Sequence, residues 1–252
     1  MEYHPTGAAS VTRRHHQGRN VILSEGHFGS LLEAYANHAR IWQTDSDGLI
    51  DVMMRQGLAA LTLHLANRPR DTSVGLTLNL KRPPLNLFLT GEAGERTVTG
   101  RAFVDGVRVA ESSRLFMQAR RPLHEPTQST IEVEGFDLLE IFEQYYARSE
   151  QHPARFFELG EDAYLMVLAL PGIDAAWLRA LDADGARALL DDTTPLEDRT
   201  FRFECGCNPQ KMIAALRSLF EGRPEELFQG ESQVEASCPR CGRRWWIQAE
   251  GF

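Results

Sequence analysis

The sequence predicts an α+β protein with a mainly antiparallel sheet, a short helical acidic linker and a small C-terminal domain that holds four cysteines. Three observations lead to this fold class. Apolar and polar residues alternate in several segments after residue 71, which is typical of half-buried strands. Helical spacing occurs before and after these segments, without regular strand–helix–strand alternation. All four cysteines lie after residue 200.

Length and composition limit the number of domains and the class of protein. A chain of 252 residues suffices for one large domain and one small domain, and 42% apolar and 25% charged residues are ordinary for a soluble globular protein. No segment approaches the roughly 18 apolar residues of a membrane helix, and the N-terminal segment lacks the apolar core of a secretory signal. A net charge of −8 argues against general nucleic-acid binding. We therefore expect a cytoplasmic protein that binds neither nucleic acid nor membrane.

The N-terminal part is expected to begin with a flexible tail over residues 1–20, which carries the basic segment RRHHQGR. A core domain then extends over residues 21–172. Apolar residues at helical spacing predict a helix over 28–42 and a longer one over 45–69. His64 on the second helix is expected to be a packed side chain and not a ligand.

The strands of the core domain follow residue 71. Val74, Leu76, Leu78 and Leu80 alternate with polar residues and predict a half-buried strand. The same pattern predicts further strands, separated by turn signals, over 85–90, 96–104, 114–120 and 129–135. Helical spacing returns over 135–153, and a buried strand over 163–172 closes the domain at Pro171-Gly172.

Residues 173–200 contain more acids than arginines and are expected to form a linker. The segment predicts one or two short amphipathic helices that rest on the core domain without adding to its core. The apolar contacts of these helices would be Trp177, Leu178, Leu181, Leu189 and Leu190.

Residues 201–252 contain a C-x-C pair, Cys205 and Cys207, and a C-x-x-C pair, Cys238 and Cys241. Two such pairs are the usual way in which a chain supplies four sulfur ligands to one tetrahedral Zn²⁺. Gly242 follows the second pair and allows the backbone to turn and to direct N–H groups at sulfur. Because about fifty residues build little core of their own, bound metal would supply much of the folding free energy.

Secondary structure in this domain is also indicated. Asn208 suits a helix N-cap and Pro209 the first helical position, which predicts a helix over 209–220. Its apolar stripe is formed by Met212, Ile213, Leu216, Leu219 and Phe220. A second short helix over 224–228 and a strand over 243–248 complete the domain.

Other uses of four clustered cysteines fit less well. A thioredoxin-like C-x-x-C requires a βαβ context that is missing around Cys238. A nucleic-acid zinc ribbon requires a basic face, whereas residues 201–252 hold as many acidic as basic side chains. Unpaired structural thiols are a weaker alternative. A zinc site made only of thiolates is either structural or a redox-controlled unfolding switch, because oxidation to disulfide removes the ligands. Both roles remain open on chemical grounds.

The sequence offers no convincing arrangement of catalytic residues. The eight histidines are scattered with no Ser/His/Asp order, and GEAGE is better explained as a turn between strands than as a phosphate loop. We expect a protein that is not an enzyme.

Several motifs together resemble a known family. They are the C-x-C pair followed by C-x-x-C, the R-S-E-Q-x-P motif of residues 148–153, the strand over 163–172, and the strand, polar turn and strand over 76–92. This combination resembles the redox-regulated heat-shock holdase chaperones, the bacterial heat-shock protein of 33 kDa. Compared with that family, the linker of residues 173–200 is shorter, and the tail of residues 1–20 takes the place of the first strand.

The resemblance implies an ATP-independent holdase. In the reduced state Cys205, Cys207, Cys238 and Cys241 would bind one Zn²⁺. Oxidation would form the Cys205–Cys207 and Cys238–Cys241 disulfides and release the metal, after which the zinc domain and linker unfold, the protein forms a homodimer, and unfolded client proteins bind. The alternative is a diverged relative with a constitutive structural zinc domain that binds clients or a fixed partner independently of redox state.

Overall fold

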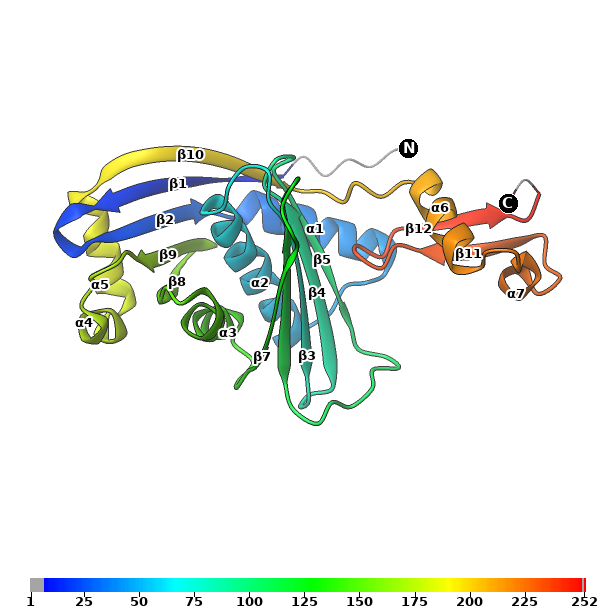
Figure 1. Cartoon of the computed structure of the whole chain (residues 1–252), viewed down its shortest axis with the longest axis horizontal. Helices are drawn as coiled ribbons and strands as arrows, with labels where there is room; N and C mark the ends of the chain where they lie inside the picture. The colour runs from blue at the N-terminus through cyan, green and yellow to red at the C-terminus, as the bar shows by residue number, and fades with distance from the viewer. Residues whose placement is uncertain (1–6, 251) are drawn as a thin grey trace.

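The structure is a computed structural model that describes residues 7–250 and 252, and it is dominated by one large sheet (Figure 1). Its strands lie in the order β7-β6-β3-β4-β5-β10-β1-β2-β9-β8. In chain order they are β1 Ala8–His16, β2 Val21–His27, β3 Ser73–Leu80, β4 Leu85–Glu92, β5 Thr97–Phe103, β6 Arg114–Arg120, β7 Thr127–Glu132, β8 Ala154–Gly160, β9 Ala163–Ala169 and β10 Thr194–Phe203.

Within the described residues, five α-helices accompany this sheet, and a small domain follows it. The helices are α1 Gly29–Trp42, α2 Leu49–Ala66, α3 Leu138–Tyr145, α4 Ala175–Ala180 and α5 Ala183–Ala188. The C-terminal domain consists of α6 Pro209–Leu219, α7 Pro224–Phe228, β11 Gln233–Ser237 and β12 Arg244–Gln248, with β11 and β12 paired. Within the described residues, no helix has both the length and the apolar character to cross a membrane.

The large sheet consists of two antiparallel groups joined at one place. All neighbouring strands pair antiparallel except β10 and β5, which are parallel over two residue pairs, Arg202 with Thr97 and Phe203 with Val98. In Figure 1, strands β3 to β7 run in a clearly different direction from β1, β2, β9 and β10. The predicted α+β class with a mainly antiparallel sheet is thus confirmed.

The main core lies between the sheet and the helices α1, α2 and α3. Almost every residue of α2 from Met53 onward is buried. The predicted alternation on β3 is confirmed, because Val74, Leu76, Leu78 and Leu80 are each at most 1% exposed. His64 is fully buried among aromatic rings and hydrogen-bonded to Tyr146, so its predicted packing role is also confirmed.

The prediction of a flexible tail over residues 1–20 is wrong for residues 8–20, while residues 1–6 lie outside the described part. Strand β1 lies between β10 and β2, and Val11 is buried in the main core. Two of its basic residues pair with acidic residues on neighbouring strands. Arg13 pairs with Glu197 at 3.5 Å, and Arg14 pairs with Glu25 at 2.9 Å. A strand therefore occupies the position that the sequence assigned to a tail.

The segment 173–200 packs against the core domain and contributes a strand to its sheet, so it is part of that domain and not a linker. As predicted, α4 and α5 rest on the sheet. The prediction that they add nothing to the core is wrong, because Leu178 and Leu181 are buried in a second apolar cluster with Val21 and Val167. The last quarter of the segment, however, belongs to β10, which continues to Phe203 and pairs with β1 along most of its length. The predicted boundary at residue 200 therefore falls inside a strand.

The R-S-E-Q-x-P motif fastens the end of α3 to its neighbours. Arg148 donates to the carbonyl of Glu132 on β7, and Ser149 contacts Ser129 on the same strand at 2.6 Å. Glu150 forms an ion pair with Arg68 next to the end of α2. The motif therefore has a structural explanation within the core domain.

Candidate metal centre

The four cysteines come together at the junction between the core domain and the C-terminal domain. Cys205 and Cys207 follow directly after β10, and Cys238 and Cys241 lie in the turn that joins β11 to β12. All four are free thiols, and their sulfur atoms lie within 4.8 Å of one another. The structure thus brings together every cysteine that the sequence assigned to a metal site.

The spacing of the sulfur atoms suits a tetrahedral metal ion. The Cys205 and Cys238 sulfurs are 3.9 Å apart, and those of Cys207 and Cys241 are 3.5 Å apart. A metal–sulfur bond of about 2.3 Å implies sulfur–sulfur separations of roughly 3.8 Å in a tetrahedron. Four sulfur donors at this spacing fit zinc or an iron–sulfur centre, both of which prefer thiolate ligands.

The turn that carries the C-x-x-C pair, residues 238–243, is here called the knuckle. The Cys238 N–H donates to the Arg243 carbonyl at 2.8 Å, and the Gly242 N–H donates to the Cys238 carbonyl at 2.9 Å. Gly242 has φ of 78°, a conformation that favours glycine. The predicted turn at Gly242 is confirmed.

The C-x-C pair is held by the start of α6. Asn208 is the N-cap of this helix, with its side chain accepting from the Lys211 N–H at 2.8 Å, and Pro209 occupies the first turn, as predicted. The Lys211 ammonium donates to the Gly206 carbonyl at 2.6 Å and so restrains the loop between the two cysteines. Local sequence signals alone are therefore enough to position this half of the site.

The C-terminal domain has a small apolar core. Its buried members are Phe228, Ala236 and Ile247, with Met212, Ile213 and Leu216 of α6 packed against them. Leu219, which the sequence placed on the same stripe, is 67% exposed. This limited burial agrees with the expectation that bound metal supplies much of the stability of the domain.

The knuckle is docked on the core domain, and the sequence does not reveal this contact. The buried His38 ring on α1 donates through Nε2 to the Cys241 carbonyl at 2.9 Å. Burial lowers the pKa of His38 below its ordinary value, although the bond to Cys241 acts in the opposite direction. On the other side of the knuckle, Arg244 donates to the Trp42 carbonyl at 2.9 Å. The end of α1 is thus the platform on which the knuckle sits.

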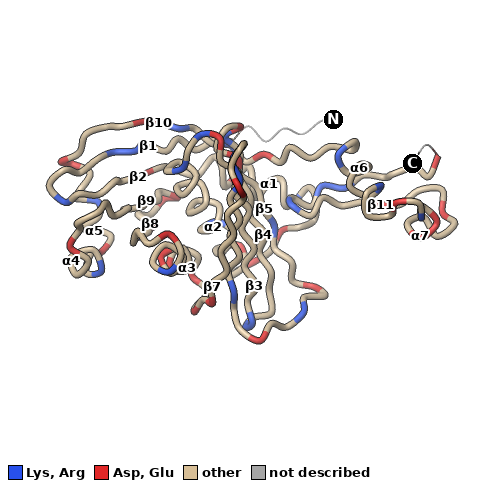
Figure 2. Tube along the Cα trace, in the orientation of Figure 1, with Lys and Arg blue, Asp and Glu red and all other residues tan. Residues whose placement is uncertain are grey.

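Close packing and positive charge complete this contact. A Cβ added to Gly242 would lie 2.4 Å from Cγ2 of Thr44, so only glycine fits there. The Arg243 guanidinium lies over the Trp42 ring at 5.8 Å, and Arg101 of β5 faces the knuckle. Figure 2 shows basic positions where the C-terminal domain meets the core. This positive charge complements thiolate ligands.

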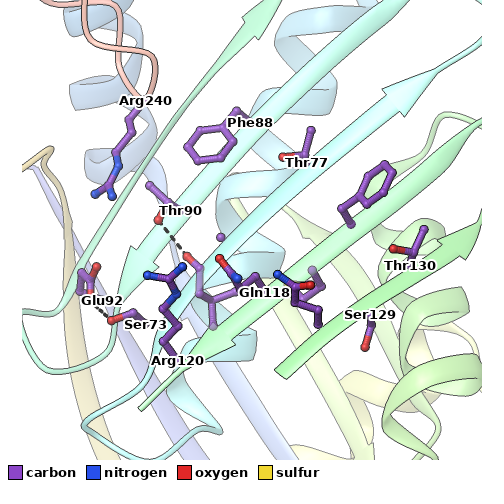
Figure 3. A pocket seen from close by; sticks show the side chains of 15 residues that line it. Ser73, Thr77, Phe88, Thr90, Glu92, Gln118, Arg120, Ser129, Thr130 and Arg240 are labelled. Atoms are coloured by element: carbon purple, nitrogen blue, oxygen red, sulfur yellow. Dashed lines mark hydrogen bonds between the residues drawn. The ribbon is translucent and has the colours of Figure 1, made fainter. Parts of the chain in front are cut away.

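The knuckle also borders a hollow on the outer face of the sheet, with a volume of about 650 Å³ (Figure 3). Arg240, between the two knuckle cysteines, extends over strands β3 and β4, near Thr90 and Phe88. Gly75 lies in the floor, where an added Cβ would meet no atom within 4 Å. The position of the knuckle therefore determines one wall of this hollow.

Comparisons with known proteins agree with the geometry. The sequence model of the Hsp33 protein family matches residues 158–248, which include all four cysteines. The chain is 28% identical to the 33 kDa chaperonin of Thermosynechococcus vestitus over 48% of this chain and 51% of that protein. It is also 28% identical to the 33 kDa chaperonin of Sodalis glossinidius over 50% of this chain and 52% of that protein, so these alignments span about half the length of each relative.

Longer alignments extend the similarity to most of the chain. The 33 kDa chaperonin of Nitrosococcus oceani is 22% identical over 80% of both chains. The crystal structure of the 33 kDa chaperonin of Thermotoga maritima superposes with a TM-score of 0.71 at 16% identity, over 97% of this chain and 95% of that one, and so shares the fold. On these grounds the chain is similar to the Hsp33 proteins, at low sequence identity, and shares their fold.

Proposed function

We propose that this protein is an ATP-independent holdase chaperone that is inactive while its four cysteines hold Zn²⁺ and is activated when they are oxidised to disulfides. The convergence of all four sulfurs within 4.8 Å is the observation that carries the proposal. The relationship to the Hsp33 proteins supports the chaperone class. The chain would act as a binding protein and not as an enzyme, in the cytoplasm, with unfolded proteins as its clients.

Zinc is the metal that the site favours. Thiolate ligands suit zinc, which has no redox chemistry of its own and closes structural sites with four protein ligands. Cys205, Cys207, Cys238 and Cys241 would hold the ion, which would supply folding free energy to a domain with few buried apolar residues.

The charges around the site explain how oxidation would loosen the docked domain. Four thiolates and one Zn²⁺ carry a net charge of −2, whereas two disulfides carry none. Arg101 is half-buried, and negative charge on Cys241 and Cys238 favours its charged form. After oxidation this cation would lose that stabilising charge, which disfavours the docked state.

Client binding would follow from undocking. Departure of the knuckle would remove Arg240 from the hollow on β3 and β4 and would expose Trp42, and the unfolded domain would add its own apolar residues. Exposed apolar surface of this kind binds unfolded chains and also favours a homodimer. No nucleic acid or membrane takes part in this scheme.

Light scattering of a heat-labile enzyme tests the proposal. One sample contains the reduced, zinc-loaded protein, and the other contains protein treated with hydrogen peroxide at elevated temperature. Suppression of aggregation by the oxidised sample alone is expected. The control is oxidised protein that has been reduced again in the presence of zinc, which should lose the activity.

A second function is favoured by one specific observation. The knuckle is fixed to α1 by the His38–Cys241 and Arg244–Trp42 hydrogen bonds, and β10 joins the core sheet two residues before Cys205. Such tight integration suits a constitutive structural zinc domain in a redox-independent client- or partner-binding protein. Equal suppression of aggregation by the reduced and oxidised samples would establish this second function in place of the first.

A further inference from the structure

The hollow on the outer face of the sheet is built around strand β3. The outward residues of β3 there are Ser73, Gly75 and Thr77, which are all small. The neighbouring strands β4 and β6 carry Phe88 and Phe116 directly beside Thr77. The floor of the hollow therefore lies at β3 and its walls at β4 and β6. Its volume of about 650 Å³ is in the range of about 300–1,000 Å³ that is typical of small-ligand sites.

Gly75 is a part of this floor that the fold itself does not require. It is not among the glycines with positive φ, and an added Cβ would meet no atom within 4 Å. Strand β3 also pairs with β4 and β6 in unbroken register, so Gly75 does not mark a bulge. By contrast, an added Cβ would lie 2.3 Å from Leu65 at Gly91 of β4 and 2.4 Å from Leu89 at Gly100 of β5. A strand glycine without such a packing reason is typical of a place where a ligand approaches the backbone closely.

Two phenylalanines flank one end of the hollow. Phe88 of β4 and Phe116 of β6 lie on opposite sides of Thr77. Phe88 is half-buried and Phe116 is 38% exposed, so neither belongs to the core. With about 4.8 Å between neighbouring strands, β4 and β6 are roughly 9.6 Å apart. A planar ring between two others needs roughly 7–8 Å, which is two van der Waals contacts. The spacing thus suits a flat aromatic group.

Two arginines line the other end of the hollow. They are Arg120 of β6 and Arg240 of the knuckle, and Figure 3 shows both side chains extending over this end. Within the part of the chain that the structure describes, neither guanidinium forms an ion pair. Glu92 lies at the same end and accepts a hydrogen bond from Ser73, so it offsets one of the two positive charges. Guanidinium groups match the geometry of carboxylate and phosphate, so this end suits a small anion.

Polar side chains connect the two ends. Gln118 and Gln128 pair across β6 and β7, and both line the hollow. Each amide offers two donors and an acceptor. These groups can recognise the polar edge of a heteroaromatic ring or the atoms that join a ring to an anion.

We infer that this hollow binds a small organic anion that carries a planar aromatic ring. The ring lies between Phe88 and Phe116, and the carboxylate or phosphate lies at Arg120 and Arg240. Because Arg240 belongs to the knuckle, the ligand contacts the core sheet and the knuckle together and prefers the docked state. The inference goes beyond the proposed function and does not rest on it, since it requires only that the knuckle is docked.

Calorimetric titration of the reduced, zinc-loaded, full-length protein tests the site. The two probes are adenosine 5′-monophosphate, which carries a phosphate, and indole-3-propionate, which carries a carboxylate. At least one of them should bind with a Kd below about 1 mM. Adenosine, inorganic phosphate and propionate each lack either the ring or the anion and should bind about tenfold more weakly or worse. Comparison of the two probes shows which anion the site prefers.

Four variants locate the bound probe. Gly75→Ile fills the floor and should abolish binding, while its urea midpoint should equal or exceed that of the wild type, because β-branched residues favour strands. Arg120→Gln and Arg240→Gln should each weaken binding about tenfold, because each removes a charge-assisted hydrogen bond. Arg179→Gln removes the same charge from an exposed position of α4 and is the control, with unchanged binding.

Each other outcome overturns the inference. Binding of neither probe does so, and so does equal binding to the wild type and G75I. Adenosine or propionate that binds as tightly as the complete probes would show that ring and anion are not recognised together. Unchanged binding to R240Q would remove the knuckle from the site and with it the preference for the docked state.

Sedimentation of the reduced protein is the last check. A dimer that G75I dissociates would assign the hollow to a second copy of this chain and not to a small anion. The light-scattering assay is independent of these measurements. If oxidation fails to activate the protein there, the proposed function is wrong and the ligand site stands.

Discussion

The imidazole Nε2 of His38 on α1 donates a hydrogen bond of 2.9 Å to the main-chain carbonyl of Cys241, one of the four clustered cysteines. The two residues are more than two hundred positions apart in the chain. This bond joins α1 of the core domain to the metal centre, so undocking of the knuckle would break it. Five predictions follow from this connection and from the elements around it.

Replacement of His38 should weaken the metal centre without touching a ligand. His38→Ala leaves the Cys241 carbonyl without its donor, and we expect a loss of about 1–3 kcal/mol in the free energy of docking. Zinc release to a chromogenic chelator should therefore be faster than in the wild type. His27→Ala, at an exposed position, is the control. Equal release rates for both variants would show that docking does not stabilise the metal site.

Substitution by alanine should lower zinc affinity at Gly242 but not at Gly206. Gly242→Ala forces a positive φ on a residue with a side chain and brings its Cβ within 2.4 Å of Thr44. Strain and overpacking together should cost about 2–4 kcal/mol and should lower zinc affinity. Gly206→Ala meets no comparable obstacle and should bind zinc as the wild type does. Competition titration with a chelator gives both affinities, and a normal affinity for G242A would contradict the docked geometry.

Removal of the metal should unfold a segment that ends at β10. We expect Cys238→Ser, or chelation of the wild type, to abolish amide protection in residues 233–248, because the local core is small. Strand β10 should stay protected, since Phe201 and Phe203 are buried in the main core. Hydrogen exchange followed by mass spectrometry locates this boundary. Loss of protection throughout 194–203 would mean that unfolding reaches the core sheet.

Arg199 should be a main anchor of β10. Its guanidinium donates to the Arg68 carbonyl at 2.7 Å at the end of α2 and pairs with Glu197 at 2.9 Å. Arg199→Met removes a buried charged donor and should lower the free energy of unfolding by about 2–4 kcal/mol in urea melts. Arg202→Met, which loses an exposed pair with Glu204, should cost less than about 1 kcal/mol. Similar losses in both variants would refute the anchoring role.

Acid should destabilise the fold through His64. Its Nε2 accepts from Arg68 at 3.2 Å and its Nδ1 donates to Tyr146 at 2.7 Å, so the ring is neutral. Burial, and then the charge of Arg68, lower the pKa of His64 well below its ordinary value. As pH falls below about 6.5 the unfolded chain takes up a proton that the folded chain does not, so stability falls by up to about 1.4 kcal/mol per pH unit.

Urea melts at pH 7.5 and 5.5 measure this effect. The non-titrating variant His64→Gln provides the comparison, because carboxylate effects are common to both proteins. The wild type should lose more stability than H64Q between the two pH values. Equal losses would show that His64 does not remain neutral in the folded state.

The sequence determined those elements whose signals are local. Strict alternation from Val74 to Leu80 was sufficient to predict a half-buried strand, because the side-chain period of a strand is two residues. The Asn208-Pro209 pair located the start of α6, because the cap and the first turn lie next to each other in the chain. The four cysteines indicated a metal site through ligand type and spacing alone.

Only the tertiary structure revealed those elements and roles that depend on residues far away in the chain. The sequence indicates a tail at β1 because this strand pairs with β10 at the other end of the chain, where Arg13 also finds its counter-charge, Glu197. The role of His38 depends on a carbonyl from the opposite end of the chain, and a carbonyl has no sequence signature. Local periodicity and spacing are physical properties of the chain itself, whereas docking and charge compensation arise only when distant segments meet.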